Sequence, residues 1–421
     1  MTLGFVGVGE ISPEARKADG TSHAKSNHAS PYHTGHRERD ETTEAPDART
    51  MAECAAGCAI IDSHIHLYPA SEVAQLSWCS ATHPLYGQKS LDEYVEAAGP
   101  PAALEGFIFL ETDRKHDLTL GAEDGRGWAM PLAEVDWVRR ISLGTPREGE
   151  GHTEEQKKLC RAIIPWAPVP SGGEVLARYV QEVERHAGES FAKIKGFRYL
   201  VQDKPRGTML TPHFIDGLRW LGRAGYVFDL GVDQRRGGRW QLEEAVLMIE
   251  RAHEGVPEAE KVTVICGKLV RVLGALAATL TDTDGGFPDH LCKPDLSVYH
   301  QSDPSFVAWR TAMFRLSRCR KTFMKLSGCF SEMPDALKQA PVDEIFLALQ
   351  PYLVVILATF GPLRIMFGSD WPVCTIGVDD AWQKWRQVVQ RFCALAGLSQ
   401  AEQIMIWSGT AIQAYGIPEV I

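Results

Sequence analysis

The chain has 421 residues, of which 44% are apolar and 23% are charged, so it can bury a sizeable core and is composed like a globular protein. Its formal net charge of −10 argues against a nucleic-acid groove, because such a groove needs a basic field to neutralise phosphates. A small-molecule substrate fits this charge better, and no nucleic-acid partner is expected.

The ten cysteines are scattered, with no CxxC pair and no secretory signal, so neither a disulfide framework nor a structural zinc site is expected. This pattern predicts free thiols in the reducing cytoplasm. The longest apolar run near the C-terminal end, residues 352–360, is far shorter than the roughly 20 residues that span a bilayer. No membrane partner is therefore expected, and the oligomeric state is not indicated.

Residues 1–50 differ in composition from the rest of the chain. They are polar, charged and rich in His, Ser, Thr, Pro and Gly, with almost no apolar pattern after Val8. Such a segment cannot bury enough apolar surface to offset its ordering entropy, so we predict a disordered tail. Met51 opens the first stretch that looks folded and is an alternative translation start.

From residue 59 onward, short apolar runs alternate with longer amphipathic or charged stretches. Eight runs read as buried strands: 59–66, 106–112, 162–168, 194–200, 226–232, 262–266, 323–328 and 365–372. Helical patterns between them cover 172–187, 211–225, 240–254 and 343–361. Because strand–helix alternation is typical of a parallel sheet covered by helices, we predict an α/β fold, a (β/α)₈ TIM barrel over residues 51–421. Residues 114–160 are too many for an ordinary connection and are expected to form an insertion over the barrel mouth.

The first predicted strand ends in two histidines. In IIDSHIHLYP, residues 60–69, His64 and His66 follow Asp62 and stand two positions apart, so they face the same side of a β-strand. A single histidine at a strand end is often satisfied by loop carbonyls. Two on one face after the first strand of a barrel favour a functional site.

Polar residues recur at the C-terminal ends of the other predicted strands, where the catalytic groups of barrel enzymes lie. The set comprises His64, His66, Glu111, Arg198, Asp229, Lys325 and Asp370. Asp370, in GSDWP, follows the last strand after a small-residue turn, a position suited to a general base or a metal ligand. An N-cap or turn aspartate is the structural alternative, but it would not explain why the strand stops there.

These residues resemble the amidohydrolase superfamily, which combines His-x-His after the first strand with an aspartate after the eighth. The finer resemblance is to its lactonase branch, the amidohydrolase-2 group, which includes 2-pyrone-4,6-dicarboxylate lactonase and sugar-acid lactonases such as L-rhamnono-γ-lactonase. It rests on phrases in matching order from residue 60 to Gly416: IDSHIHLYP, FLETDR, IIPWAPVPSG, KGFRYLVQD, FDLGVDQ, DHLCKPDL, MKLSG and IMFGSDWPVC. Together these phrases are specific to the branch, but they do not indicate the substrate.

The resemblance implies a role for each matching position. Asp370 would be the general base that takes a proton from water, and His64, His66 and His290 would polarise the lactone carbonyl or hold a metal that does so. The implied substrate-binding residues are Glu111, Arg198, Lys325, Trp166 and Trp371, with Arg114 and Trp78 as further candidates. An ion pair across the barrel mouth is as plausible for Arg198 and Lys325, and ordinary packing is as plausible for the tryptophans.

The metal content is left open by the sequence. Two-metal amidohydrolases carry a carboxylated lysine on the fourth strand and histidines on the fifth and sixth, whereas this chain has KGFRYL and FDLGVDQ at the fourth and fifth. This departure argues against a two-metal centre. The resemblance therefore implies either no metal or one divalent ion, zinc first, held by His64, His66 and Asp370.

The implied activity is hydrolysis of a small lactone, in particular a sugar-acid (aldono) lactone, to its hydroxy acid. A zinc-dependent decarboxylase or a hydrolase of C–N bonds in the same superfamily is the alternative. A third interpretation is a catalytically impaired homologue, because one segment interrupts the site region.

That segment lies in VTVICGKLVRVLGALAATLTDTDGGFPDHLCKPDL, where 22 residues, 267–288, separate the sixth strand from the DHLCKP phrase that should end it. Gly267-Lys268 can be encoded as GGT AAG, which contains the intron donor GTAAG, and Pro288-Asp289 as CCA GAC, which contains the acceptor CAG. Thr283-Asp284 can supply a branch-point-like CTGAC. Removing the segment restores VTVICDHLCKPDL in frame, so we predict a retained intron. The alternative is a real insertion, since KLVRVLGALAATL has an acceptable helical pattern.

Overall fold

The computed structural model describes residues 58–100, 104–232, 240–267 and 302–418. All of them lie within the compact unit Pro46–Ile421. Residues 1–50 and most of 267–288 therefore lie outside the described residues. The disorder of the tail and the origin of the inserted segment stay predictions.

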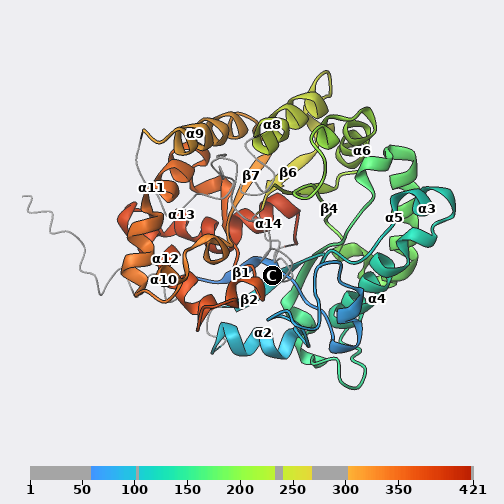
Figure 1. The fold of residues 1–421 in the computed structure, drawn as a ribbon, viewed down its shortest axis with the longest axis horizontal. Helices are drawn as coiled ribbons and strands as arrows, with labels where there is room; N and C mark the ends of the chain where they lie inside the picture. Colours follow the sequence, from blue (N-terminus) through green and yellow to red (C-terminus); the bar gives the residue numbers. More distant parts are fainter. Residues whose placement is uncertain (1–57, 101–103, 233–239, 268–301, 419–421) are drawn as a thin grey trace, which may run out of the picture. The chain divides into compact units, whose positions relative to one another are not determined.

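The eight predicted strands are all present among the described residues, and each lies within or close to its predicted run. Their bounds are β1 Ile60–Ile65, β2 Leu104–Leu110, β3 Cys160–Ile164, β4 Gly196–Leu200, β5 Val227–Gly231, β6 Thr263–Cys266, β7 Thr322–Leu326 and β8 Ile365–Phe367. The strands pair in parallel in the orders β1-β2-β3 and β4-β5-β6-β7-β8. Isolated parallel bridges, Ile163 with Ile194 and Ile65 with Trp371, link the two sheets. The predicted α/β barrel is confirmed (Figure 1).

Helices follow the strands and surround them. They are α2 Leu91–Ala98, α3 Leu118–Asp124, α4 Ala129–Leu143, α5 Gly173–Ala187, α6 Pro212–Arg223, α8 Trp240–His253, α9 Pro304–Ser317, α10 Asp335–Lys338, α11 Val342–Phe360, α12 Ala381–Leu395, α13 Gln400–Ile404 and α14 Thr410–Tyr415. The helices predicted at 172–187, 211–225, 240–254 and 343–361 correspond to α5, α6, α8 and α11. Local sequence explains their starts: α6, for example, begins at Pro212 after Thr211, whose side chain accepts a hydrogen bond from the Phe214 amide.

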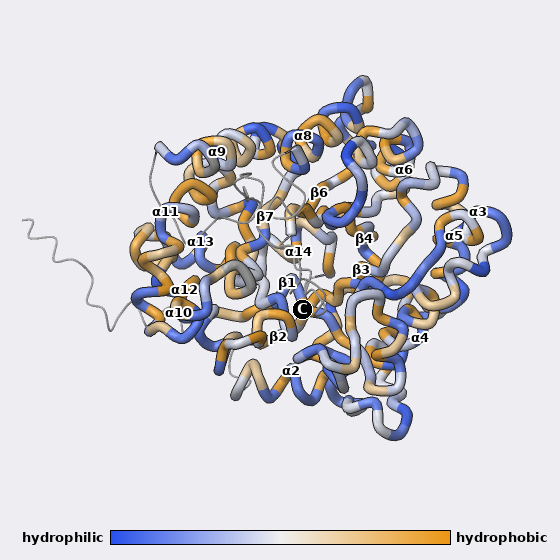
Figure 2. Tube along the Cα trace, viewed as in Figure 1, coloured by the Kyte–Doolittle hydropathy of each residue, from blue (hydrophilic) through white to orange (hydrophobic). Residues whose placement is uncertain are grey.

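The strands are largely apolar (Figure 2), and most of their residues are buried, as is typical of parallel strands that are covered on both faces. One face packs on the helix ring, and the other fills the barrel interior. The interior cluster joins inward residues of the strands, such as Ile61, Ile164 and Phe323, to Ala411 and Tyr415 of α14. The C-terminal helix therefore packs into the barrel from the N-terminal ends of the strands, which leaves their C-terminal ends for the site.

Residues 114–160 contain the helix α4, which packs against α5 in the ring and against β3. At the start of this segment, the chain pairs with the loop after β1, through a bridge between Leu76 and Arg114 and a hydrogen bond from the Ser77 amide to the Asp113 carbonyl. Part of the segment is thus an ordinary ring helix. The placement of the remainder over the mouth stays a prediction.

Helix α11 is the one described helix that is long and apolar enough to cross a membrane by length and composition. It packs against α9 and α12 in the ring around the barrel, with Ile345, Leu349 and Tyr352 buried. Of its 18-residue apolar window, 28% is buried inside the structure. The expectation that no segment spans a membrane stays a prediction.

Removal of residues 1–50 is expected to change neither the melting temperature nor the turnover number, because a disordered tail contributes no packing. Thermal unfolding and kinetics of the chain that starts at Met51, compared with the full chain, test this. A clear drop in melting temperature on removal of the tail would contradict the predicted disorder.

Candidate active site

His64, His66 and Asp370 come together at the C-terminal ends of β1 and β8. The Nε2 atoms of His64 and His66 lie 3.2 Å apart, and Asp370 Oδ1 lies 3.2 Å from His64 Nε2 and 3.7 Å from His66 Nε2. One ligand atom from each of the three residues lies within 4.8 Å of the others, and all three residues are largely buried. Strand alternation places both imidazoles on the same side of β1, as the sequence predicted.

The turn that carries Asp370 is pinned to β1 by a buried carboxylate. Asp62 Oδ1 accepts hydrogen bonds from the amides of His64 and Ser369, at 3.2 and 2.8 Å. Its Oδ2 accepts from Tyr94 Oη of α2 and Trp382 Nε1 of α12, at 3.1 and 3.0 Å. Burial raises the pKa of Asp62, and the hydrogen bonds from Ser369, Trp382 and His64 oppose that rise. Asp62 thus holds the two halves of the site in register.

Asp370 itself adopts a left-handed backbone conformation, with φ of 63°. Its amide donates to the His64 carbonyl at 2.8 Å, and its carbonyl accepts from the Cys374 amide at 3.0 Å. Aspartate and asparagine enter this region more readily than other non-glycine residues. The backbone therefore favours a short polar side chain at this position.

The orientation of His66 is set by two carbonyl groups at the end of β2. His66 Nδ1 lies 3.1 Å from the Leu110 oxygen and 2.9 Å from the Glu111 oxygen. Carbonyl oxygens only accept, so Nδ1 carries the hydrogen and donates. In the neutral ring, Nε2 then presents its lone pair toward His64 and Asp370, which is the tautomer that a metal ligand or a proton acceptor requires.

Lys325, Asp229 and Tyr415 form a buried polar cluster next to His64. Lys325 Nζ donates to Asp229 Oδ2 at 2.6 Å and lies 3.5 Å from His64 Nδ1. Tyr415 Oη of α14 donates to the same Asp229 oxygen at 2.7 Å. Burial lowers the pKa of Lys325, while Asp229 opposes that change. For Lys325, the structure thus shows an ion pair with Asp229, one of the two interpretations left open by the sequence.

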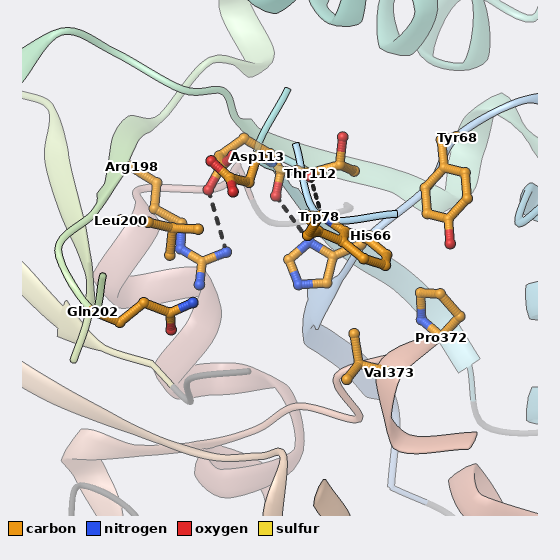
Figure 3. Close-up of a pocket in the computed structure, with 11 residues that line it drawn as sticks. His66, Tyr68, Trp78, Thr112, Asp113, Arg198, Leu200, Gln202, Pro372 and Val373 are labelled. Carbon is orange, nitrogen blue, oxygen red and sulfur yellow. Dashed lines mark hydrogen bonds and ion pairs between the residues drawn. The ribbon is translucent and has the colours of Figure 1, made fainter. Parts of the chain in front are cut away.

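A pocket opens beside His66 and contains about 520 Å³ of empty space, part of it open to solvent. It is lined by His66, Tyr68, Trp78, Glu111, Thr112, Asp113, Arg198, Leu200, Gln202, Pro372 and Val373. Figure 3 shows Arg198 and Gln202 on one side, Tyr68 and Pro372 on the other, and His66 between them. The pocket thus combines polar groups with two aromatic rings next to the His–His–Asp cluster.

Glu111 and Arg198 form a buried pair at the pocket wall, with Arg198 Nη1 3.5 Å from Glu111 Oε1. Burial raises the pKa of Glu111 to about 8, and the neighbouring Arg198 opposes this rise. The Nε atom of Arg198 is buried and has no hydrogen-bond partner among the described residues. Both side chains can therefore bind polar groups of a ligand in the pocket.

The other predicted site residues are placed less directly. Trp166 is buried against His116 and Tyr179, and Trp371 is buried against Tyr94; neither lines the pocket. Trp78, named only as a further candidate, does line it. A substrate role for Trp166, Trp371 or Lys325 stays a prediction.

Arg114 is buried away from the pocket lining, where its Nη1 lies 2.6 Å from Glu72 and 2.8 Å from the Gln75 side chain. These contacts tie the loop after β1 to the segment after β2. His290 lies outside the described residues, so its predicted role stays a prediction.

Several residues of the site were missed in the sequence. Tyr68, Asp113 and Gln202 line the pocket, and Tyr415 reaches the site from the last helix. Tyr68 and Asp113 lie two positions beyond the recognised His66 and Glu111, so the period-two rule could have suggested them. No local pattern places Tyr415 there, because its contact with Asp229 spans 186 positions of the chain.

Comparison with known proteins identifies the family to which this chain belongs. The chain is 32% identical over 366 residues to L-rhamnono-gamma-lactonase of Scheffersomyces stipitis, a match that covers 85% of this chain and 98% of that protein. The sequence profile of the family described as Amidohydrolase matches residues 288–417. The chain belongs to the amidohydrolase family. The predicted superfamily is thereby confirmed.

Other proteins similar to this amidohydrolase support the same family assignment and the same fold. L-fucono-1,5-lactonase of Burkholderia multivorans is 29% identical over 246 residues, covering 58% of this chain and 69% of that protein. A crystal structure of an amidohydrolase from Burkholderia multivorans with bound zinc superposes with a TM-score of 0.56 at 23% identity, covering 86% of this chain and all of that one. At this identity the superposition supports the shared barrel fold.

Proposed function

We propose that this amidohydrolase hydrolyses a sugar-acid lactone to the corresponding hydroxy acid, with Asp370 as general base. The observation that carries the proposal is the placement of Asp370 Oδ1 3.2 Å from His64 Nε2, at the mouth of a barrel next to a polar pocket. The similarity to L-rhamnono-gamma-lactonase over nearly the whole length of that protein supports the substrate class.

In the proposed reaction, Asp370 accepts a proton from water as the water oxygen bonds to the lactone carbonyl carbon. The ring C–O bond then breaks, and the alkoxide oxygen takes up the proton that Asp370 holds. One water is consumed, and one carboxylic acid and one hydroxyl group form. Asp370 is suited to this role because its carboxylate is buried at the mouth, beside two imidazoles.

The negative charge that develops on the carbonyl oxygen needs stabilisation at the same place. His66 Nε2 presents a lone pair beside His64 and Asp370, because Nδ1 donates to the carbonyls after β2, so stabilisation at this point would come from a cation that the ring binds. Two imidazole nitrogens and one carboxylate oxygen are a donor set that suits a divalent ion such as zinc, which would polarise the carbonyl when bound. The set has three ligands, which fits one ion rather than two.

Substrate hydroxyls are proposed to bind along the pocket wall. Arg198 and Gln202 offer donors, and Glu111, whose pKa burial raises to about 8, offers carboxyl oxygens beside them. Trp78 and Tyr68 line the pocket and can pack on the apolar face of a sugar ring. This combination of donors and aromatic rings suits a small polyhydroxylated ring.

A panel of aldonolactones tests the substrate class by measurement of acid release. Steady acid release without loss of carbon dioxide is expected, because hydrolysis of a lactone retains all carbon atoms. Carbon dioxide release from aromatic acids, or turnover of amides without turnover of any lactone, would instead support the decarboxylase or C–N hydrolase alternative.

Metal analysis of purified protein is expected to find at most one divalent ion per chain, and zinc is the expected ion. The cluster of His64, His66 and Asp370 is the one group of at least three potential ligands found among the described residues. Addition of a chelator should remove activity only where such an ion is found. A stoichiometry near two ions per chain would contradict this assignment.

We also propose that the protein is located in the cytoplasm. Within the described residues, Cys79, Cys160, Cys319 and Cys393 are free thiols, as a reducing compartment favours. The proposed partner is the small lactone, and neither nucleic acid nor membrane is expected to bind.

A further inference from the structure

A second cluster of reactive side chains lies at the other end of the barrel, in the connections that lead into β6 and β7. Cys319 Sγ, just after α9, lies 3.3 Å from Nδ1 of His253, the last residue of α8. His253 Nε2 lies 2.9 Å from the Val262 carbonyl oxygen. Because a carbonyl oxygen only accepts, Nε2 carries the hydrogen, and Nδ1 of the neutral ring accepts the thiol hydrogen of Cys319.

This arrangement has the three parts of an activated nucleophile: the thiol, a base within hydrogen-bond reach, and a third group that orients the base. Burial lowers the pKa of His253, and the nearby Lys261 and Lys321 act in the same direction. The bond to Val262 and the charge of Glu258 oppose that change. The geometry places the Nδ1 lone pair toward the thiol, so Nδ1 is positioned to accept its proton.

The thiol faces a surface cavity with about 1400 Å³ of empty space, including space open to solvent. Both thiol and imidazole are half-buried, so small molecules can reach them. The residues that line the cavity with them are Val246, Ile249, Glu250, Glu258, Lys261, Arg315, Leu316, Arg318 and Arg320. No residue of the proposed lactone pocket belongs to this set.

The charges in the cavity favour an anionic ligand. The two carboxylates are already paired, Glu250 with Arg315 at 3.1 Å and Glu258 with Lys261 at 2.7 Å. Arg318 and Arg320 flank Cys319 in the sequence, are exposed, and form no ion pair within the part of the chain that the structure describes. The thiol thus lines the cavity together with two guanidinium groups that can bind carboxylates.

We propose that Cys319 is a thiol modification site that undergoes exchange with small disulfides carrying carboxylate groups, with His253 as the base. The thiol proton passes to His253 Nδ1, and the Cys319 sulfur bonds to one sulfur of the disulfide. The disulfide S–S bond breaks, and its electron pair leaves on the second sulfur, which takes up the proton from the imidazolium. Cys319 is oxidised to a mixed disulfide, and one equivalent of the small thiol is released.

The full chain can be tested with two disulfide probes, the dianionic bis(3-carboxy-4-nitrophenyl) disulfide and the neutral 4,4′-dipyridyl disulfide, followed by peptide mapping. Cys79 and Cys329 are half-buried thiols outside the cavity and serve as internal references. Cys319 is expected to react at least about tenfold faster than either reference. Its advantage with the anionic probe should shrink as salt is added, and its advantage with the neutral probe should not.

Four variants separate the contributions. Cys319→Ser should abolish the fast phase with both probes. Arg318→Gln combined with Arg320→Gln should slow the anionic probe several-fold and leave the neutral probe unchanged, while Arg310→Gln, an exposed arginine of α9 outside the cavity, should change neither. His253→Gln should slow both probes.

The proposal is overturned if Cys319 reacts no faster than Cys79 and Cys329 in the unmodified chain, a comparison that does not depend on any variant folding. It is also overturned if a folded His253→Gln chain, checked by its melting temperature, keeps the full rate. In either case the contact between Cys319 and His253 would serve only to tie two connections together. Loss of the preference for the anionic probe at low salt would overturn the assignment of the ligand class.

Discussion

Asp370→Asn is expected to lower kcat by about 10²–10⁴-fold while leaving the fold nearly intact, because loss of a general base has an effect of this size. Asparagine has the same shape as aspartate, and it tolerates the left-handed backbone found at this position, with φ of 63°. The amide of residue 370 can still donate to the His64 carbonyl, since that bond involves only the main chain. The mutation therefore removes the basic oxygen and little else.

The measurement is steady-state kinetics on the best lactone of the panel, with the melting temperature recorded for both proteins. Asp380→Asn is a matched control, because Asp380 also has a positive φ, of 51°, but is exposed at the start of α12, outside the pocket lining. It should leave kcat unchanged. Equal activity of the Asp370→Asn chain and the parent would remove Asp370 from the mechanism.

Deletion of residues 267–288 is expected to have the second large effect, a gain of both stability and lactone turnover. The described part of β6 ends at Cys266, and a side chain on Gly267 would begin 2.9 Å from Asp229 Oδ1 and 3.5 Å from the His64 ring. The chain position directly after β6 thus lies against the site. The family profile matches from residue 288, which is the last residue of the suspected insertion.

We therefore propose that the active chain lacks residues 267–288, so that Asp289 and His290 directly follow Cys266. His290 would then stand at the end of β6, where a barrel strand presents its catalytic side chain. The gain in kcat/KM is expected to reach about 10²-fold or more, the size of a contribution from one acid–base or electrostatic group. In the full chain the residue at that position is Gly267, which has no side chain to supply such a group.

Two chains should be compared with the full-length protein, by kinetics and by thermal unfolding. One lacks residues 267–288, and the other carries a glycine–serine linker of equal length in their place. If only the first is active, the continuity of β6 with His290 matters; if all three are equally active, the segment is a tolerated insertion. Sequencing of the mature transcript tests the origin, and a message that still encodes GKLVRVLG would refute the retained intron. The effect of Asp370→Asn is best measured in whichever of these three chains has the highest kcat.

The barrel was predictable because its signals are local. Runs such as IIDSHIH and IMFGSD are apolar enough to be strands buried on both faces, and helical patterns with caps such as Thr211 separate them. Parallel strands bring their C-terminal ends to one rim, so the strand-end rule also placed His64, His66 and Asp370 in one site. The order of the sequence motifs further indicated the family and its lactonase branch.

Tertiary structure decided which polar strand-end residue faces the pocket and which faces the barrel interior. Glu111 and Arg198 line the pocket, whereas Lys325 turns toward Asp229 and is held there by an ion pair. In the sequence, both kinds of residue stand at the C-terminal end of a strand. That position does not show which neighbours surround the side chain in the closed barrel.

The sequence by itself determined the α/β barrel, the family resemblance and the three residues at the ends of β1 and β8, since these depend on periodicity and on short motifs. Only the folded chain revealed that Asp62 pins the turn of Asp370 to β1, that Tyr415 reaches Asp229 from the last helix, and that Cys319 meets His253. These contacts join residues that are 307, 186 and 66 positions apart. Such distant partners are chosen by the packing of whole elements, which no local pattern records.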